Sequence, residues 1–262
     1  MAGMNVRWRV AGVALLVALA GCGAVSPGSG GATSTTAETT VSGVSGDEQA
    51  VDAFDLAEAH RDSLTNQSFT VTSTSTVQYA NGTVALRQYT RTQVDPTTNT
   101  VLSRQTVDGR DPGQFFVPFE GVVELWTNES TSLGQRTYEN GTTDPIERRQ
   151  DGVVNDEQLT RWEDLALLLS SGDARVVDGD RTSDTIVATG AENTELAYGE
   201  PEQLTVTARL SDGDHLDSYT VSYETTRGGT PVQVTRTVRF TNVGETTVQQ
   251  PSWVSEAQNS SS

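Results

Sequence analysis

Two histidines and one cysteine are the side chains of this sequence with the widest range of possible chemistry. A single cysteine excludes disulfides and multi-thiolate metal sites within the chain. His60 falls on an apolar stripe beside Ala57 and Leu64, which predicts a partly buried, hydrogen-bonded ring. His215 follows an acidic hairpin and is expected in a solvated turn. Since no nucleophile elbow is present, no catalytic residue is assigned, and an enzyme is the third of three hypotheses.

Acidic turns raise the question of calcium binding. Asp212, Asp214 and Asp217 place three carboxylates within six residues, and Asp178 with Asp180 repeats the pattern. The stretch lacks the ligand spacing and the closing glutamate of an EF-hand, and Asp-Gly is also common turn chemistry. We therefore expect no metal site and no cofactor.

The cysteine stands in an informative context. Arg7 and Arg9 precede an apolar run that is too short to span a bilayer, and small residues follow, as in a secretory signal peptide. The sequence Leu-Ala-Gly-Cys that ends at Cys22 resembles the lipobox of bacterial and archaeal lipoproteins. That resemblance implies removal of residues 1–21, a lipid on Cys22, and attachment to the extracytoplasmic face of the cell membrane. The alternative is a stray cysteine in an ordinary signal peptide.

The chain is strongly acidic. It has 35 acidic residues against 17 basic ones, all arginine, for a net charge of −18. Loss of residues 1–21 would remove two arginines and no acid, which takes the charge to −20. Such a surface repels nucleic acid in dilute buffer and keeps a protein soluble in concentrated salt. The acidity, the missing lysine and the many threonines resemble secreted proteins of halophilic archaea, and a mesophilic acidic surface protein is the alternative.

Composition divides the mature chain. Residues 22–46 are mostly Gly, Ser, Thr and Ala, and predict a disordered tether because they cannot bury enough apolar surface to offset ordering entropy. Residues 47–254 predict one domain. Residues 255–262 are polar and predict a disordered tail.

Within the domain, two helices flank and interrupt a series of strands. Asp55 and Glu58 match a capping box for a first helix ending at Asn66, with Phe54 as its hydrophobic staple. Asn155 and Gln158 match the start of a second helix that ends at Gly172. Alternation of apolar and polar residues predicts antiparallel strands. They are expected at residues 69–79, 83–94, 101–108, 122–126, 136–139, 174–177, 185–189, 204–210, 219–223 and 232–240.

This element order, together with the lipoprotein context, resembles the LolA-like half-barrel of lipoprotein carriers, and more closely a group of haloarchaeal lipoproteins of unknown function. The resemblance implies an α+β fold in which a curved antiparallel sheet, a half-barrel, wraps around two or three helices after the signal peptide and tether. No carrier motif matches residue by residue, so no functional residue is transferred.

Large apolar residues cluster in two segments and define a possible pocket for an apolar or lipid ligand. They are Phe115, Phe116, Phe119, Trp126, Leu159, Trp162, Leu165 and Leu169, with Leu168 in the same stripe as the last four. The alternative is a fully packed core, which makes the protein a structural or protein-interaction domain of the cell envelope. Arg236 is in phase with Val234 and Val238, which predicts an inward side chain that pairs with a carboxylate or a ligand head group.

Five Asn-x-Ser/Thr triplets could accept glycans on an exported chain. Asn81 and Asn140 are the better candidates because each precedes a glycine at a predicted turn tip.

Overall fold

The structure is a computed structural model that describes residues 50–115, 120–147, 159–180, 183–190, 196–211 and 215–260. They all lie in one compact unit, Thr39–Ser262. The predicted signal peptide, the tether and Cys22 lie outside the described residues. None of the helices in the described ranges has the length and hydropathy of a membrane span.

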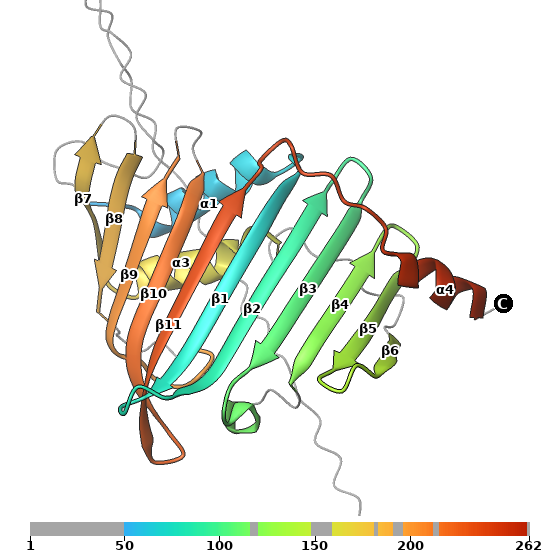
Figure 1. Cartoon of the computed structure of the whole chain (residues 1–262). Helices are drawn as coiled ribbons and strands as arrows, with labels where there is room; N and C mark the ends of the chain where they lie inside the picture. Colours follow the sequence, from blue (N-terminus) through green and yellow to red (C-terminus); the bar gives the residue numbers. More distant parts are fainter. Residues whose placement is uncertain are drawn as a thin grey trace, which may run out of the picture. The chain divides into compact units, whose positions relative to one another are not determined.

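Eleven strands form one antiparallel sheet in the order β6-β5-β4-β3-β2-β1-β11-β10-β9-β8-β7 (Figure 1). Its strands are β1 (Phe69–Tyr79), β2 (Val84–Asp95), β3 (Thr100–Asp108), β4 (Gly121–Thr127), β5 (Ser132–Tyr138), β6 (Thr143–Glu147), β7 (Asp173–Asp180), β8 (Ser183–Thr189), β9 (Glu202–Leu210), β10 (Leu216–Arg227) and β11 (Thr230–Thr241). The helices are α1 (Ala53–Leu64), α3 (Trp162–Ser170), α4 (Ser252–Ser260) and a short 3₁₀ turn, η1 (Pro112–Phe115).

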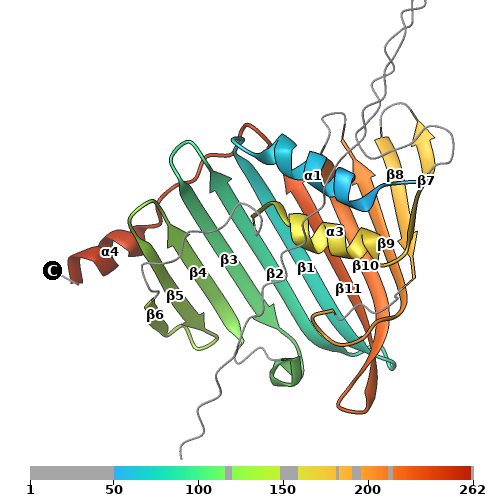
Figure 2. The ribbon, with the colours of Figure 1, turned by 180° about the vertical axis from the view of Figure 1, so that it is seen from behind.

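The chain builds this sheet as two meanders that meet at its centre. Strands β1 to β6 run outward in one direction, and β7 to β11 return from the opposite edge until β11 pairs with β1. The sheet is open and curved, with α1 and α3 on one face (Figure 2). The predicted α+β half-barrel is therefore confirmed.

The face that carries α1 and α3, here called the helix face, holds the core. On β1 it presents Val71, Ser73 and Val77, and on β11 it presents Val234 and Val238, all of them buried. Side chains alternate along a strand, so the even-numbered residues of β1 belong to the opposite, outer face. The alternation that predicts the strands thus also separates a packed face from a polar one.

The first helix begins three residues earlier than predicted. Its N-cap is Asp52, whose carboxylate accepts hydrogen bonds of 3.0 Å from the backbone N–H groups of Phe54 and Asp55. Asp55 is therefore inside the first turn, where it faces the positive end of the helix dipole, and the predicted capping box is wrong. Phe54 is 58% exposed and does not act as a staple.

Helix α3 carries the predicted apolar stripe, but its ends differ. It begins at Trp162 after Arg161, which has a left-handed backbone (φ 61°), and the predicted cap at residues 155–158 lies outside the described range. Gly172 does follow the helix, for a reason of packing rather than of conformation. A Cβ at Gly172 would lie 2.3 Å from the carbonyl oxygen of Thr189, so only glycine lets the chain enter β7 this close to β8.

Two elements were not predicted. Strand β6 is short, contains Pro145 and lies at the sheet edge, where a residue without an N–H donor is tolerated. Helix α4 replaces the disordered tail expected from residue 255 onward, as far as Ser260. Val254 of this helix is fully buried, so tertiary packing orders a segment whose composition alone predicts disorder.

Candidate functional site

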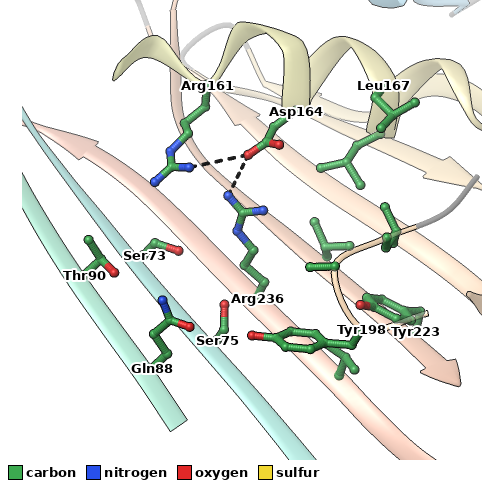
Figure 3. Close-up of a pocket in the computed structure, with 15 residues that line it drawn as sticks. Ser73, Ser75, Gln88, Thr90, Arg161, Asp164, Leu167, Tyr198, Tyr223 and Arg236 are labelled. Atoms are coloured by element: carbon green, nitrogen blue, oxygen red, sulfur yellow. Dashed lines mark hydrogen bonds and ion pairs between the residues drawn. The ribbon is translucent and has the colours of Figure 1, made fainter. Parts of the chain in front are cut away.

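A cavity of about 350 Å³ lies between α3 and the helix face of β1, β2, β10 and β11 (Figure 3). Residues Leu196 to Tyr198 form another part of its wall. Most of its lining side chains are polar. These are Ser73, Ser75, Gln88, Thr90, Arg161, Asp164, Tyr198, Tyr223 and Arg236.

Charged side chains from two elements meet at the roof of the cavity. Arg236 of β11 donates a 2.8 Å hydrogen bond to Asp164 of α3, and Arg161 lies 3.7 Å from the same carboxylate. Burial alone lowers the pKa of Arg236, but Tyr219 and Asp164 raise it above its ordinary value, so the guanidinium stays charged. The predicted inward position of Arg236 and its carboxylate partner are confirmed.

One acid between two arginines leaves this cluster with a net positive charge. Figure 3 shows both guanidinium groups turned toward Asp164 above the cavity. An anionic group that entered the cavity would meet Arg236 and Arg161 in a partly desolvated place, where charge-assisted hydrogen bonds are strong.

Three tyrosines surround this cluster. Burial raises the pKa of Tyr223 and of Tyr219 to about 12 in each case, and it raises the pKa of Tyr198 against the opposing effects of Arg236 and Ser75. All three phenols are therefore neutral hydrogen-bond donors at physiological pH. The Tyr219 hydroxyl has no hydrogen-bond partner among the described residues, although the charges of the arginine–aspartate cluster act on it.

The remaining wall is apolar. Leu167 and Leu168 of α3 face Val221 and Val234 of the sheet, and Leu196 closes the wall. Leu167 is 48% exposed and so lies at the rim, whereas Leu168 is buried. The cavity thus combines an apolar side with a cationic, hydroxyl-rich one, which suits an amphipathic ligand.

Among the described residues predicted for an apolar pocket, Leu168 alone lines this cavity. Leu159, Leu165 and Leu169 are buried in the packed core, so they hold α3 against the sheet. Phe115 is also buried, with its ring centroid 6.0 Å from that of Tyr198. Phe116 and Phe119 lie outside the described residues. Hydrophobicity defines the predicted set, and hydrophobic side chains are also those that fill a core.

The two tryptophans of the predicted pocket occupy other places. Trp162 is only half-buried and lies under the guanidinium of Arg61, 5.5 Å from the ring centroid. Trp126 pairs with Leu102 in the sheet register and belongs to the outer face, opposite the cavity. Arg161 and Asp164 were missed, although their i, i+3 spacing is the kind that joins opposite charges on a helix.

Residues 7–257 match the family of unknown function DUF7537. The chain belongs to the DUF7537 family. No curated protein matches it. Among solved structures, it is similar to a DUF1329 family protein from Desulfovibrio piger, at 10% identity over 76% of this chain and 93% of that one, with a TM-score of 0.28. It is also similar to MucB in complex with MucA, at 11% identity over 72% of this chain and 94% of that one, with a TM-score of 0.15.

In this DUF7537 protein, His60 is a structural residue. Its ring is fully buried, 4.6 Å from the ring of Phe240 between centroids. The Leu216 N–H donates to Nδ1 at 3.1 Å, so the proton must be on Nε2, which donates to the Thr160 carbonyl at 3.0 Å. Burial lowers its pKa to about 4. The expectation of a buried, hydrogen-bonded histidine is confirmed.

His215 is less solvated than expected, since its side chain is 14% exposed. Its Nδ1 lies 3.1 Å from the Ser211 hydroxyl, and its Nε2 lies 4.0 Å from Asp217. The three residue types are those of a hydrolase triad, but the second distance exceeds a hydrogen bond and all three residues come from one β-hairpin. The contacts of His215 with Ser211 and Asp217 stabilise the turn of this hairpin.

The remaining predicted sites are at the surface. No group of three potential metal ligands occurs among the described residues, and Asp212 and Asp214 lie outside them. Asn81 and Asn140 are exposed at turns, where each side chain accepts a hydrogen bond from the backbone N–H two residues later. Both positions are accessible, and their glycosylation stays a prediction.

Proposed function

We propose that this DUF7537 protein is a non-enzymatic lipoprotein, anchored by Cys22 to the extracytoplasmic face of a haloarchaeal cell membrane, that binds a small amphipathic ligand in the cavity under α3. The observation that carries the ligand part of the proposal is the position of Arg236 and Arg161 beside an apolar wall in one partly open cavity. The anchor is supported by the sequence, in which Arg7 and Arg9, an apolar run and Leu-Ala-Gly-Cys follow one another.

The polarity of the cavity specifies the ligand. A purely apolar molecule would displace water from the arginine, tyrosine and serine groups of the lining without offering them a hydrogen bond in return, which costs about 1–3 kcal/mol for each polar group left unsatisfied. A ligand with an acidic head and an apolar body satisfies both walls. We therefore propose a small amphiphile with an acidic head group.

Calorimetric titration with decanoate and with decanol tests the ligand. Both have the same apolar chain, and only decanoate carries a charge. We expect decanoate to bind more tightly, and Arg236→Gln to remove most of that preference. Arg110→Gln is the matched control, because Arg110 is an exposed arginine outside the cavity whose nearest carboxylate is that of Asp111, 3.9 Å away.

Equal affinity for the two compounds, or an equal effect of both substitutions, would contradict an acidic head group at Arg236. Mass spectrometry of small molecules extracted from the protein purified from its own host then gives an independent identification of the ligand.

The anchor has a separate test. Cys22→Ser should stop lipoprotein processing or release the protein from the membrane fraction, and unchanged fractionation and migration would exclude Cys22 as the lipid site.

A structural or protein-interaction domain of the cell envelope is the second candidate. It is favoured by the complete burial of Leu165 and Leu169, which shows that most of α3 is packed against the sheet rather than held as a lid. Absence of binding by decanoate, decanol and host lipids would leave this function as the better one.

A further inference from the structure

The outer face of the sheet carries an ordered pattern of polar side chains. The pairing register aligns residues of six adjacent strands, from β3 through β2, β1, β11 and β10 to β9, into rows perpendicular to the strands. One row contains four arginines. It reads Arg104, Arg91, Thr72, Arg239, Ser218 and Arg209.

All four arginines of this row are exposed on the face away from α1 and α3, toward the viewer in Figure 1. With about 4.8 Å between strands, the six strands extend the row over roughly 24 Å. In the described part of the chain, Arg104 pairs with Glu124 at 3.3 Å, whereas no ion pair involves Arg91, Arg209 or Arg239. A protein of net charge −18 thus has a cationic row on the outer face of its sheet.

Without a bound ligand, this row lowers the stability of the folded sheet. Arg91 and Arg104 are directly opposite each other on neighbouring strands, an arrangement in which like charges destabilise the sheet. A ligand that brings negative charge along the row would remove this repulsion. Charge complementarity therefore points to an anionic partner.

The neighbouring rows are rich in hydroxyl groups. Next to the arginine row lie Thr106, Tyr89, Thr74, Thr237, Thr220 and Thr207. The row beyond it includes Thr76, Thr235, Ser222 and Thr205. Tyr89 is 40% exposed, and its ring is the one large apolar surface in these described rows.

We propose that this arginine row and its hydroxyl-bearing neighbours bind an extended acidic polysaccharide. Guanidinium groups recognise carboxylates in a bidentate manner, threonine and serine hydroxyls pair with sugar hydroxyls, and Tyr89 offers a flat ring for a sugar face. A lipid surface fits less well because Tyr89 is the one large apolar side chain that these rows offer for insertion. Single-stranded nucleic acid fits less well because it needs several stacking rings, and the rows hold one.

Binding of the purified full-length chain to polygalacturonate, an acidic polysaccharide, tests the proposal. The measurement uses the lowest salt at which circular dichroism shows the protein folded, with neutral dextran as the uncharged comparison. We expect polygalacturonate to bind and dextran not to bind. The double variant Arg91→Gln, Arg239→Gln should raise the Kd at least about tenfold, since each substitution removes charge-assisted hydrogen bonds.

Arg110→Gln with Arg227→Gln is the matched control. It removes the same charge from two arginines that lie outside these outer-face rows, one in a loop and one at the end of β10, where it donates to the Gln114 carbonyl at 3.5 Å, and it should change the Kd about twofold or less. Arg209→Gln alone is a second variant should the double one fold poorly. No binding of polygalacturonate, equal weakening by both double variants, or tighter binding to phosphatidylglycerol vesicles or poly-dT would each overturn the proposal. The decanoate titration reports on the opposite face, so either result stands without the other.

Discussion

Acidification should destabilise this protein through one buried histidine. The ring of His60, on α1, is buried against Phe240 of β11 and the start of β10; its Nε2 donates to the Thr160 carbonyl and its Nδ1 accepts from the Leu216 N–H. Protonation of Nδ1 would replace an acceptor by a donor that faces the Leu216 N–H. The ring can therefore take up a proton only at the expense of that hydrogen bond and of burying a charge.

The size of the effect follows from the difference in pKa between the two states. The pKa of His60 is about 4 in the folded chain against 6.5 for an unperturbed histidine. Between these values the unfolded chain binds more protons than the folded one, so the free energy of unfolding falls as the pH is lowered from 6.5 toward 4. The total loss is about 3 kcal/mol, of which about 2 kcal/mol falls between pH 7 and pH 5.

Urea unfolding at pH 7, 6 and 5 measures this loss, in about 1 M salt so that surface carboxylates interact little. In His60→Gln the residue no longer titrates. Its free energy of unfolding should be lower at pH 7 through poorer hydrogen bonding, but should depend on pH less than that of the wild type by about 2 kcal/mol over this range. His215→Gln, which removes the other histidine, should keep the wild-type dependence.

Parallel pH dependence of the wild type and His60→Gln would refute this reasoning. Should His60→Gln fail to fold, NMR titration of the His60 ring protons in the wild type gives the folded-state pKa directly. A midpoint near 6.5 would then contradict the proposed cause.

Three further predictions concern packing and charge. Leu169→Ala should lower the free energy of unfolding by about 2–5 kcal/mol, whereas Leu167→Ala, at a half-exposed position of the same helix, should cost less than about 1 kcal/mol; chemical denaturation compares them. Gly172→Ala should lower the melting temperature well below that of Gly113→Ala, because a Cβ collides with backbone at Gly172 and has open space at Gly113; similar melting temperatures would contradict the close approach. The melting temperature of the wild type should rise between about 0.1 M and 1 M salt as self-repulsion is screened, and a flat response would contradict the halophilic interpretation.

The local sequence pattern was sufficient to predict most of the helices and strands. Alternation predicted ten of the eleven strands, and Asn81-Gly82 placed the first hairpin, because a strand with one packed face needs a period of two and a tight turn needs a residue with positive φ. The phase of Arg236 within β11 was also sufficient to predict an inward side chain with a carboxylate partner. Apart from Asp164, the distant partner of Arg236, each of these features depends on residues close together in the sequence.

Features that join distant segments were decided by the tertiary structure. Alternation shows that Trp126 differs in face from its neighbours in β4, but only the register through β3, β2 and β1 shows that its face lies opposite α3. Val254 is ordered by what it packs against rather than by the propensity of its segment. The arginine row depends on the pairing of β1 with β11, which brings together residues more than 140 positions apart. No local pattern contains that information, because the cross-strand register of the two meanders exists only once the chain has closed its sheet.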